Sequence, residues 1–246
     1  MPEKTAYLPG EPIWTDLSSP DCAASAAFYG ALLGWEVTEG DPAMGGYASF
    51  LLDGRVVAGL VPVTTSVQPT TWTAYFCTED AAATTTLVEQ AGGSTVVAPM
   101  QVAGLGTMAV YADPQGAVFG VWQPGSHRGS ELTGQDGTQT WFELTAEDPA
   151  AAPEFYGRVL GWEASVSDAY VLLSLDGRSV AGVADPSQGT AGWLPYFQVA
   201  DPAACAEQVQ ALGGTVVLPL TTFDGGSCVI VRDPQGAVVG LLRSEG

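Results

Sequence analysis

The stretch FYGALLGWE, residues 28–36, decides the fold, because it returns as FYGRVLGWE at residues 155–163. Two further segments recur in the same order. WTDL at residues 14–17 is matched by WFEL at 141–144, and DPQGAV at 113–118 returns unchanged at 233–238. A repeat period of about 120 residues is too long for a solenoid unit and has the length of a small domain. The sequence therefore predicts a tandem duplication.

Within each copy, helix signals alternate with strand signals. Four aspartates stand where a helix N-cap is expected: Asp21, Asp80, Asp148 and Asp201. Pro149 would be the first residue of the third helix, a position that tolerates proline, and Gly34 would end the first. Short strand-like runs follow each helix. Each copy thus has the pattern β-α-β-β-β twice, so the chain carries that unit four times.

The domain boundaries follow from the repeat and from composition. We expect one domain at residues 10–124 and a second at residues 139–244. Between them, residues 125–138 are polar and rich in glycine and serine, which is typical of an interdomain linker. The chain's single histidine, His127, lies in this segment and is expected to be a solvated residue without a role.

Charge and composition limit the function classes. The formal net charge is −20, with only 7 Lys and Arg residues, so nucleic acid and anionic membrane surfaces are poor partners. No apolar run approaches the roughly 20 residues of a membrane helix, and the N-terminus does not resemble a signal peptide. The four cysteines have no CxxC spacing. We therefore expect a cytoplasmic protein with free thiols.

The order and spacing of these motifs resemble those of the vicinal oxygen chelate superfamily, which includes glyoxalase I, bleomycin-resistance proteins and extradiol dioxygenases. The W-x-[DE]-L and FY…GW pattern is most similar to a tandem-domain group of actinobacterial hydroxylase-like and secreted-antigen proteins. The resemblance covers nearly the whole chain. It implies an α+β fold of two tandem glyoxalase-like domains, in each of which two βαβββ units form an open, cup-shaped barrel.

The same resemblance implies a metal site inside the cup, but this sequence departs from the family pattern there. The first-strand ligand position falls on Trp14 and Trp141, and the position on the second unit's first strand falls near Thr73 and Leu194. The last-strand glutamate position is occupied by Gly120 and Gly240. None of these side chains is a ligand for a divalent cation. We therefore expect no metal and no other cofactor in either cup.

Aromatic and acidic side chains are expected to line the cup instead. Residues two apart on a strand share a face, so Asp16 would accompany Trp14 and Glu143 would accompany Trp141. Further predicted wall residues recur in both copies: Trp72, Tyr75 and Phe76 in the first, and Trp193, Tyr196 and Phe197 in the second. Gly120 and Gly240 would leave room for a ligand. Core packing and structural hydrogen bonding are the alternative roles for the tryptophans and the carboxylates, respectively.

Two functions fit this pattern, and an enzyme is favoured. Buried carboxylates beside aromatics can act as general acids or bases, so Asp16 and Glu143 are the catalytic candidates, with Tyr75 and Tyr196 as hydrogen-bond donors. The reaction would be a metal-independent, cofactor-free isomerisation, cyclisation or dehydration of an aromatic or polyketide-like metabolite. The alternative is a non-catalytic protein that sequesters a hydrophobic antibiotic, as bleomycin-resistance relatives do.

The duplication leaves two further questions open. One cup could be active while the other only supports the fold, because aspartate and glutamate differ in length by one methylene. The βαβββ units could also pair within a domain or between domains. We expect a monomer that acts as a pseudo-dimer, with a true dimer as the alternative.

Overall fold

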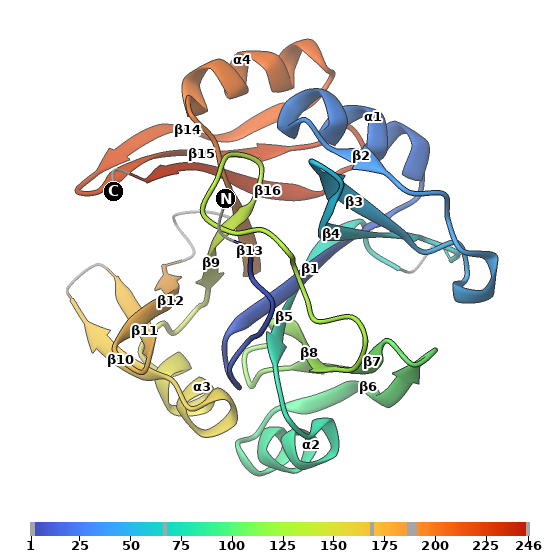
Figure 1. Ribbon diagram of the computed structural model, residues 1–246. Coiled ribbons are helices and arrows are strands. Elements are labelled where there is room, and N and C mark those ends of the chain that lie inside the picture. The colour runs from blue at the N-terminus through green and yellow to red at the C-terminus, as the bar shows by residue number, and fades with distance from the viewer. Residues whose placement is uncertain (1–2, 66–67, 168–169, 186–190, 245–246) are drawn as a thin grey trace.

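The computed structural model describes residues 3–65, 68–167, 170–185 and 191–244. It contains two eight-stranded sheets with the same strand order, β2-β3-β4-β1-β5-β8-β7-β6 in the first and β10-β11-β12-β9-β13-β16-β15-β14 in the second. Figure 1 shows each sheet curving around its own concave side. The first sheet consists of β1 (Pro12–Ser19), β2 (Glu36–Val37), β3 (Ala48–Leu52), β4 (Arg55–Pro62), β5 (Thr71–Cys77), β6 (Ser94–Val102), β7 (Gly106–Ala112) and β8 (Val118–Pro124).

The second sheet repeats the first. Its strands are β9 (Gln139–Thr145), β10 (Glu163–Val166), β11 (Val171–Leu175), β12 (Arg178–Ala184), β13 (Gly192–Gln198), β14 (Thr215–Phe223), β15 (Gly226–Arg232) and β16 (Val238–Ser244). The predicted duplication of βαβββ units is confirmed, as is the α+β fold class. In each domain the two units join through an antiparallel pair, β1 with β5 and β9 with β13. The units therefore pair within a domain.

In the described parts of the chain, four α-helices accompany the strands: α1 (Cys22–Leu33), α2 (Ala81–Gln90), α3 (Ala152–Leu160) and α4 (Pro202–Ala211). Asp21, Asp80 and Asp201 are N-caps whose carboxylates accept backbone N–H bonds, as predicted. Gly34 ends α1 in the left-handed conformation, with φ of 73°. A short 3₁₀ turn, η1 (Pro42–Met44), lies between β2 and β3.

The predicted start of the third helix is wrong. Asp148 does not cap α3, which begins at Ala152 behind Ala151 without a side-chain cap, and Pro149 lies outside the helix. The backbone of Asp148 is instead held by the Gln115 side chain of the other domain. The Asp148 N–H donates to Gln115 Oε1 at 2.7 Å, and Gln115 Nε2 donates to the Asp148 carbonyl at 3.0 Å.

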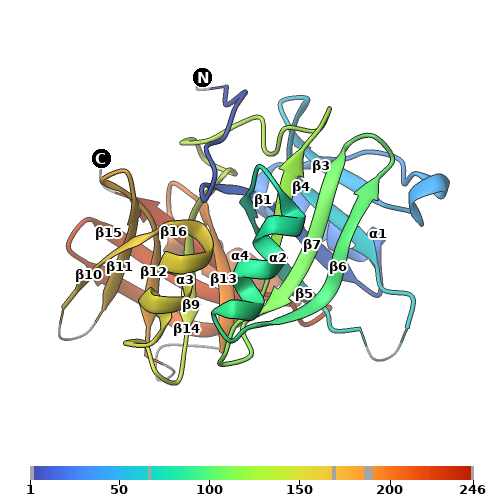
Figure 2. The same cartoon turned by 90° about the horizontal axis from the view of Figure 1, so that it is seen from below.

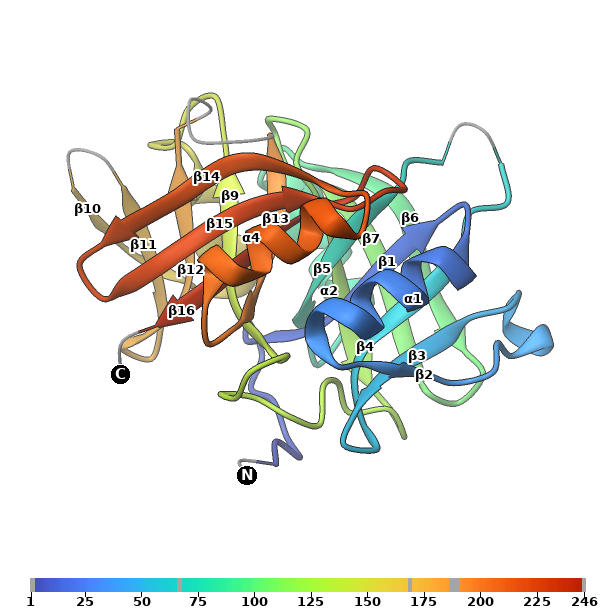
Figure 3. The same ribbon diagram turned by 90° about the horizontal axis from the view of Figure 1, so that it is seen from above.

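The two domains pack through the sheet faces opposite the cups. Helix α1 contacts α4, and α2 contacts α3, as Figures 2 and 3 show from opposite sides. Aromatic rings from both domains meet in this interdomain core: Trp35 contacts Phe197, and Trp162 contacts Phe76, each at 4.9 Å between ring centroids. The repeated FY…GW segments therefore build the interface between the copies.

Residues 125–138 run along the first domain in an ordered path. The Ser130 N–H donates to the Ile13 carbonyl at 3.0 Å, the Glu131 N–H donates to the Val56 carbonyl at 2.8 Å, and Leu132 is buried. None of the helices in the described parts of the chain is long and apolar enough to cross a membrane.

Candidate functional site

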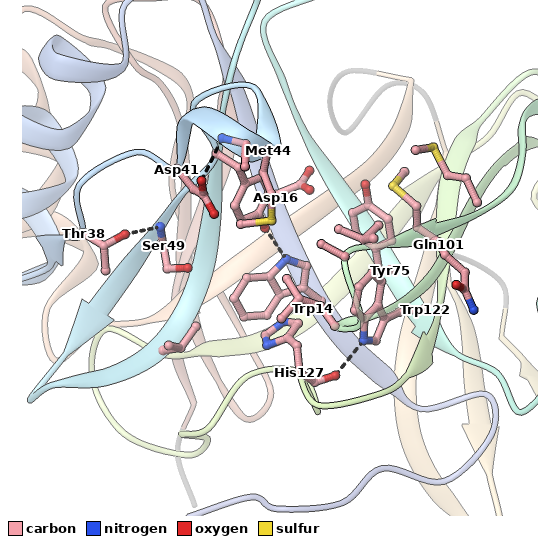
Figure 4. Close-up of a pocket in the computed structure, with 18 of the residues that line it drawn as sticks. Trp14, Asp16, Thr38, Asp41, Met44, Ser49, Tyr75, Gln101, Trp122 and His127 are labelled. Atoms are coloured by element: carbon pink, nitrogen blue, oxygen red, sulfur yellow. Dashed lines mark hydrogen bonds between the residues drawn. The ribbon is translucent and has the colours of Figure 1, made fainter.

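The concave side of the first sheet holds a cavity of about 630 Å³. Its walls come from β1, β5 and β8 in the middle, from β3, β4, η1 and the segment after β2 on one side, and from β6 and β7 on the other. His127 from the linker completes the lining. Figure 4 shows Trp14 at its centre, with Asp41 and Ser49 on one side and Gln101 and Trp122 on the other.

Trp14 and Asp16 lie together in this cavity, as their two-residue spacing on β1 predicts. The Trp14 indole donates from Nε1 to the hydroxyl of Tyr47 on the loop before β3, at 3.1 Å. This bond fixes the indole across the middle of the cavity (Figure 4).

Asp16 is a carboxylate deep in a mostly apolar cavity. It is 7% exposed. Burial raises the pKa of Asp16 to about 7, although hydrogen bonds from Tyr75 and Thr73 favour the ionised form. An acid that titrates near neutrality can both accept and return a proton at physiological pH. The electrostatic environment therefore suits Asp16 to general acid–base chemistry.

Much of the remaining wall is aromatic, aliphatic or sulfur-containing. Tyr75 lies on β5 and Trp122 on β8, while Met44, Met100 and Met108 line the two sides. Flat aromatic rings stack on such surfaces, and methionine side chains adapt to irregular ligand shapes. Carboxylates at one side, Glu39 and Asp41, add negative charge to the lining.

His127 is not the solvated residue that its linker position suggested. Its imidazole packs edge-on against Trp14, with ring centroids 4.5 Å apart, and also contacts Trp122 at 5.5 Å. Burial lowers the pKa of His127, although nearby Glu131 opposes this effect. The backbone of His127 is also held: its N–H donates to the Leu105 carbonyl at 3.0 Å, and its carbonyl accepts from Trp122 Nε1 at 2.9 Å. The imidazole is thus a fixed part of the cavity wall.

Gly120 does not leave the open space expected for a ligand. A Cβ atom at this position would lie 2.2 Å from the Tyr75 ring, and one at Gly240 would lie 2.1 Å from the Tyr196 ring. Each glycine lets a tyrosine from the neighbouring strand lie flat across β8 or β16. The tyrosine rings therefore occupy the space that a side chain at Gly120 or Gly240 would need.

Four of the predicted wall residues lie on the other face of the sheets. Trp72 and Phe76, with Trp193 and Phe197, are buried in the interdomain core and do not line the cavity. Trp72 Nε1 donates to the Tyr29 hydroxyl at 2.9 Å. Strand alternation explains this correction, because residues 72 and 76 face away from Tyr75.

The second cup holds its carboxylate between two tyrosines. Glu143 Oε2 accepts from the Tyr170 hydroxyl and Oε1 accepts from the Tyr196 hydroxyl, both at 3.0 Å. Trp141 Nε1 donates to Tyr170 at 3.2 Å, which repeats the Trp14–Tyr47 bond. Burial raises the pKa of Glu143, and the two tyrosine bonds oppose that rise. Both oxygens of Glu143 are thus engaged by protein groups.

The side chains of the first cup do not fit the divalent metal that the family resemblance implies. Trp14 on β1 and Thr73 on β5 stand at the ligand positions, and the Tyr75 ring fills the place of a side chain on β8 at Gly120. Asp16 is the carboxylate on β1, two residues after Trp14. No group of three or more His, Cys, Asp or Glu side chains able to hold a metal occurs in the described ranges.

Sequence reasoning missed Tyr47 and His127 as site residues. Tyr47 could have been found, because Tyr47 and Tyr170 each precede a repeated Asp-Gly turn by six residues. His127 has no counterpart in the second copy, so the repeat gave no signal for it.

The comparisons agree with this architecture. The model of the glyoxalase-like domain matches residues 13–122 and again residues 141–242. Anthracycline biosynthesis protein DauV of Streptomyces sp. (strain C5) is 39% identical, over 95% of this chain and 93% of that protein. The putative glyoxylase CFP32 of Mycobacterium tuberculosis (strain CDC 1551 / Oshkosh) is 32% identical, over 99% of this chain and 98% of its own length.

Solved structures show the same fold at low sequence identity. The Mn(II)-bound glyoxalase from Novosphingobium aromaticivorans has a TM-score of 0.66 and 17% identity, over 96% of this chain and 82% of that one. The 2,3-dioxygenase LapB from Pseudomonas sp. KL28 has a TM-score of 0.67 and 14% identity, over 96% and 92%. With two matched domains, this chain belongs to the glyoxalase-like domain family and has the vicinal oxygen chelate fold.

Proposed function

We propose that this protein is a tailoring enzyme for a small aromatic or polyketide-like metabolite, which it binds in the cup of the first domain. The observation that carries this proposal is the buried carboxylate of Asp16 in an aromatic-walled cavity of about 630 Å³. This volume is in the range of sites for drug-sized molecules. The similarity to a protein named for anthracycline biosynthesis supports the same class of ligand.

The proposed chemistry is proton transfer at a carbon next to a carbonyl group. The ionised Asp16 carboxylate takes the proton from that carbon, and the bond's electron pair moves onto the carbonyl oxygen as an enolate. Return of the proton to another position gives an isomer. Alternatively, the enolate carbon attacks a second carbonyl and closes a ring, and the oxygen of that carbonyl takes the proton back from Asp16. Tyr75, which hydrogen-bonds to Asp16, orients the carboxylate. These steps need no metal and no other cofactor.

Asp16 is the catalytic candidate in this proposal, and Glu143 supports the second cup. Asp16 lines the described cavity, whereas both oxygens of Glu143 are bonded to Tyr170 and Tyr196. The two tyrosine hydrogen bonds favour the ionised form of Glu143, so they weaken it as a base. The second domain then serves chiefly to cover the outer face of the first.

Solvent deuterium exchange tests the chemistry without knowledge of the product. The protein is incubated in D₂O with a panel of aromatic β-diketones, and incorporation at the carbon between the carbonyls is followed by mass spectrometry. Wild-type protein should accelerate exchange, Asp16→Asn should lose the acceleration, and Glu143→Gln should retain it. Full exchange by Asp16→Asn would refute the role of Asp16.

A second candidate function is the sequestration of a cationic hydrophobic antibiotic. It is favoured by the charge of the lining, which contains Asp16, Glu39 and Asp41 and, among the residues that the structure describes, no lysine or arginine. Under this alternative, Asp16→Asn weakens binding of a cationic aromatic probe but not of its neutral analogue, and no exchange is accelerated. Deuterium exchange by the wild type distinguishes the enzyme from the binding protein.

The proposal extends to the setting of the protein. We propose that the protein acts in the cytoplasm as a monomer in which the two domains form a pseudo-dimer. A monomer is sufficient for ligand binding, because each cup is formed by the strands of one domain. Sedimentation velocity would give the mass of one 25.3 kDa chain. A stable species of twice this mass would support the dimer instead.

A further inference from the structure

We propose that a second hollow beside the cavity binds a carboxylate of the ligand, so that the substrate is a flat aromatic acid. This inference rests on the proposed function, because it assumes that the aromatic body of the ligand occupies the cavity. The hollow has a volume of about 150 Å³. It lies at the linker, and Lys4, Arg55, His127 and Arg128 are among its lining residues.

The hollow concentrates positive charge in a strongly acidic protein. Three of the chain's seven Lys and Arg residues line it, together with the single histidine, although the formal net charge is −20. Glu3 and Glu131 also line it. Lys4 pairs with buried Glu11, and Arg55 pairs with Glu3. Among the described residues, Arg128 is therefore the cation of the hollow without a carboxylate of its own, which matches a ligand with a single negative charge.

His127 lies between the hollow and the cavity, because this residue lines both. In Figure 4, His127 lies below the Trp14 indole and the Asp16 carboxylate lies above it. A ligand lying along Trp14 would therefore place one end near Asp16 and the other near His127.

Two cations of the hollow, Arg55 and Arg128, are available to a ligand, whereas Lys4 pairs with buried Glu11 at 3.1 Å. Among the described residues, Arg128 forms no ion pair, and its side chain is exposed. Arg55 pairs with Glu3, but both side chains are about half exposed, and such surface pairs are weak. Glu131 accepts the Val56 N–H at 2.9 Å, which orients its carboxylate but leaves its negative charge in place. A ligand carboxylate can therefore bind Arg128 and compete for Arg55, with bidentate geometry available at either guanidinium.

The ligand class follows from the two ends of this path. Asp16, at one end, suits a keto or hydroxyl group, since a second carboxylate there would be repelled. The hollow at the other end suits one carboxylate. The structure thus favours a monoanionic aromatic acid with its reactive carbonyl distant from the carboxylate.

Two matched probes test this inference: anthraquinone-2-carboxylate and the neutral anthraquinone-2-carboxamide. Their dissociation constants are measured by quenching of tryptophan fluorescence at low salt and neutral pH. Wild-type protein should bind the carboxylate about tenfold more tightly than the carboxamide. Arg128→Gln should weaken carboxylate binding about threefold to tenfold and leave carboxamide binding unchanged. The control Arg158→Gln, on the exposed face of α3, should change neither.

The single histidine gives an independent readout. The NMR signals of the His127 imidazole should shift on addition of the carboxylate probe, and Arg128→Gln should require proportionally more probe for the same shift. Equal affinities of wild-type protein for the two probes would overturn the inference and leave the proposed function intact. Failure of both probes to bind would count against the aromatic cavity itself, and with it against the inference.

Discussion

Tyr29 and Asp233 are joined across the domain boundary: the Tyr29 hydroxyl donates to Asp233 Oδ2 at 3.0 Å, and both residues are buried. The relationship is repeated with the domains exchanged, because Tyr156 donates to Asp113 at 3.0 Å. Each aspartate also accepts backbone N–H bonds within its own DPQGA turn. In both cases, the tyrosine of the FYG motif in one copy is therefore bonded to the aspartate of the DPQGA motif in the other copy.

Tyr29→Phe should destabilise the protein by about 1–3 kcal/mol, because it removes one donor from a buried carboxylate. Urea unfolding measures the loss. Tyr156→Phe is its counterpart and should cost a similar amount. An unchanged free energy of unfolding in both variants would show that these bonds do not stabilise the interface.

Glu11→Gln should weaken the contact between the N-terminal segment and the second domain. Glu11 is buried and pairs with Lys4 at 3.1 Å and Arg178 at 2.9 Å. Burial opposes its ionisation, but the Leu8 N–H and the two cations outweigh burial, so the pKa of Glu11 is lowered. A lowered pKa stabilises the fold above the ordinary glutamate pKa, and this stabilisation is lost as pH falls through the folded-state value. The variant should therefore be about 1 kcal/mol less stable at pH 7 and equal to wild type in acid.

Asp16→Asn should have the opposite pH dependence. The folded-state pKa of Asp16 is about 7, above the ordinary value of 3.8. The folded state then holds its proton more tightly than the unfolded state, so stability falls as pH rises from about 4 to 7. Asparagine removes this loss, which amounts to at most roughly 4 kcal/mol. Denaturant unfolding at pH 4 and pH 8 should show the variant gaining stability relative to wild type only at the higher pH.

Gly120→Ala and Gly240→Ala form a matched pair that separates stability from ligand binding. Each added methyl group would displace a tyrosine ring, Tyr75 or Tyr196, at a cost of about 1–3 kcal/mol. Only the displaced Tyr75 belongs to the described cavity. Fluorescence titration with 1,8-dihydroxyanthraquinone should therefore show weaker binding in Gly120→Ala alone. Equal weakening in both variants would mean that the second cup also binds the probe.

Much of the fold could be predicted from the repeat. The order of strands and helices follows from local periodicity, and the caps at Asp21 and Gly34 follow from residue chemistry. The joint placement of Trp14 and Asp16 follows from the alternation of side chains along β1.

The residues that were misplaced depend on contacts far apart in the sequence. Both faces of β5 are buried, one by the cup and one by the other domain, so apolar residues occupy both faces and do not show which one faces the ligand. For this reason, the sequence could not show that Trp72 faces the other domain and not the cup. The path that brings His127 onto Trp14 depends on hydrogen bonds of the linker to β1 and β4. Asp148 was misread because Gln115 of the other domain holds it.

We propose that the cup of the first domain is the ligand site. Met108 on β7 lines that cavity, and Cys228 on β15 has the corresponding position in the second cup. The measurement is the dissociation constant of 1,8-dihydroxyanthraquinone for wild type, Met108→Trp and Cys228→Trp, with circular dichroism as the control for folding. Met108→Trp, which fills the first cavity, should weaken binding at least about tenfold, and Cys228→Trp should leave it unchanged. Loss of binding in Cys228→Trp with full binding in Met108→Trp would contradict the account.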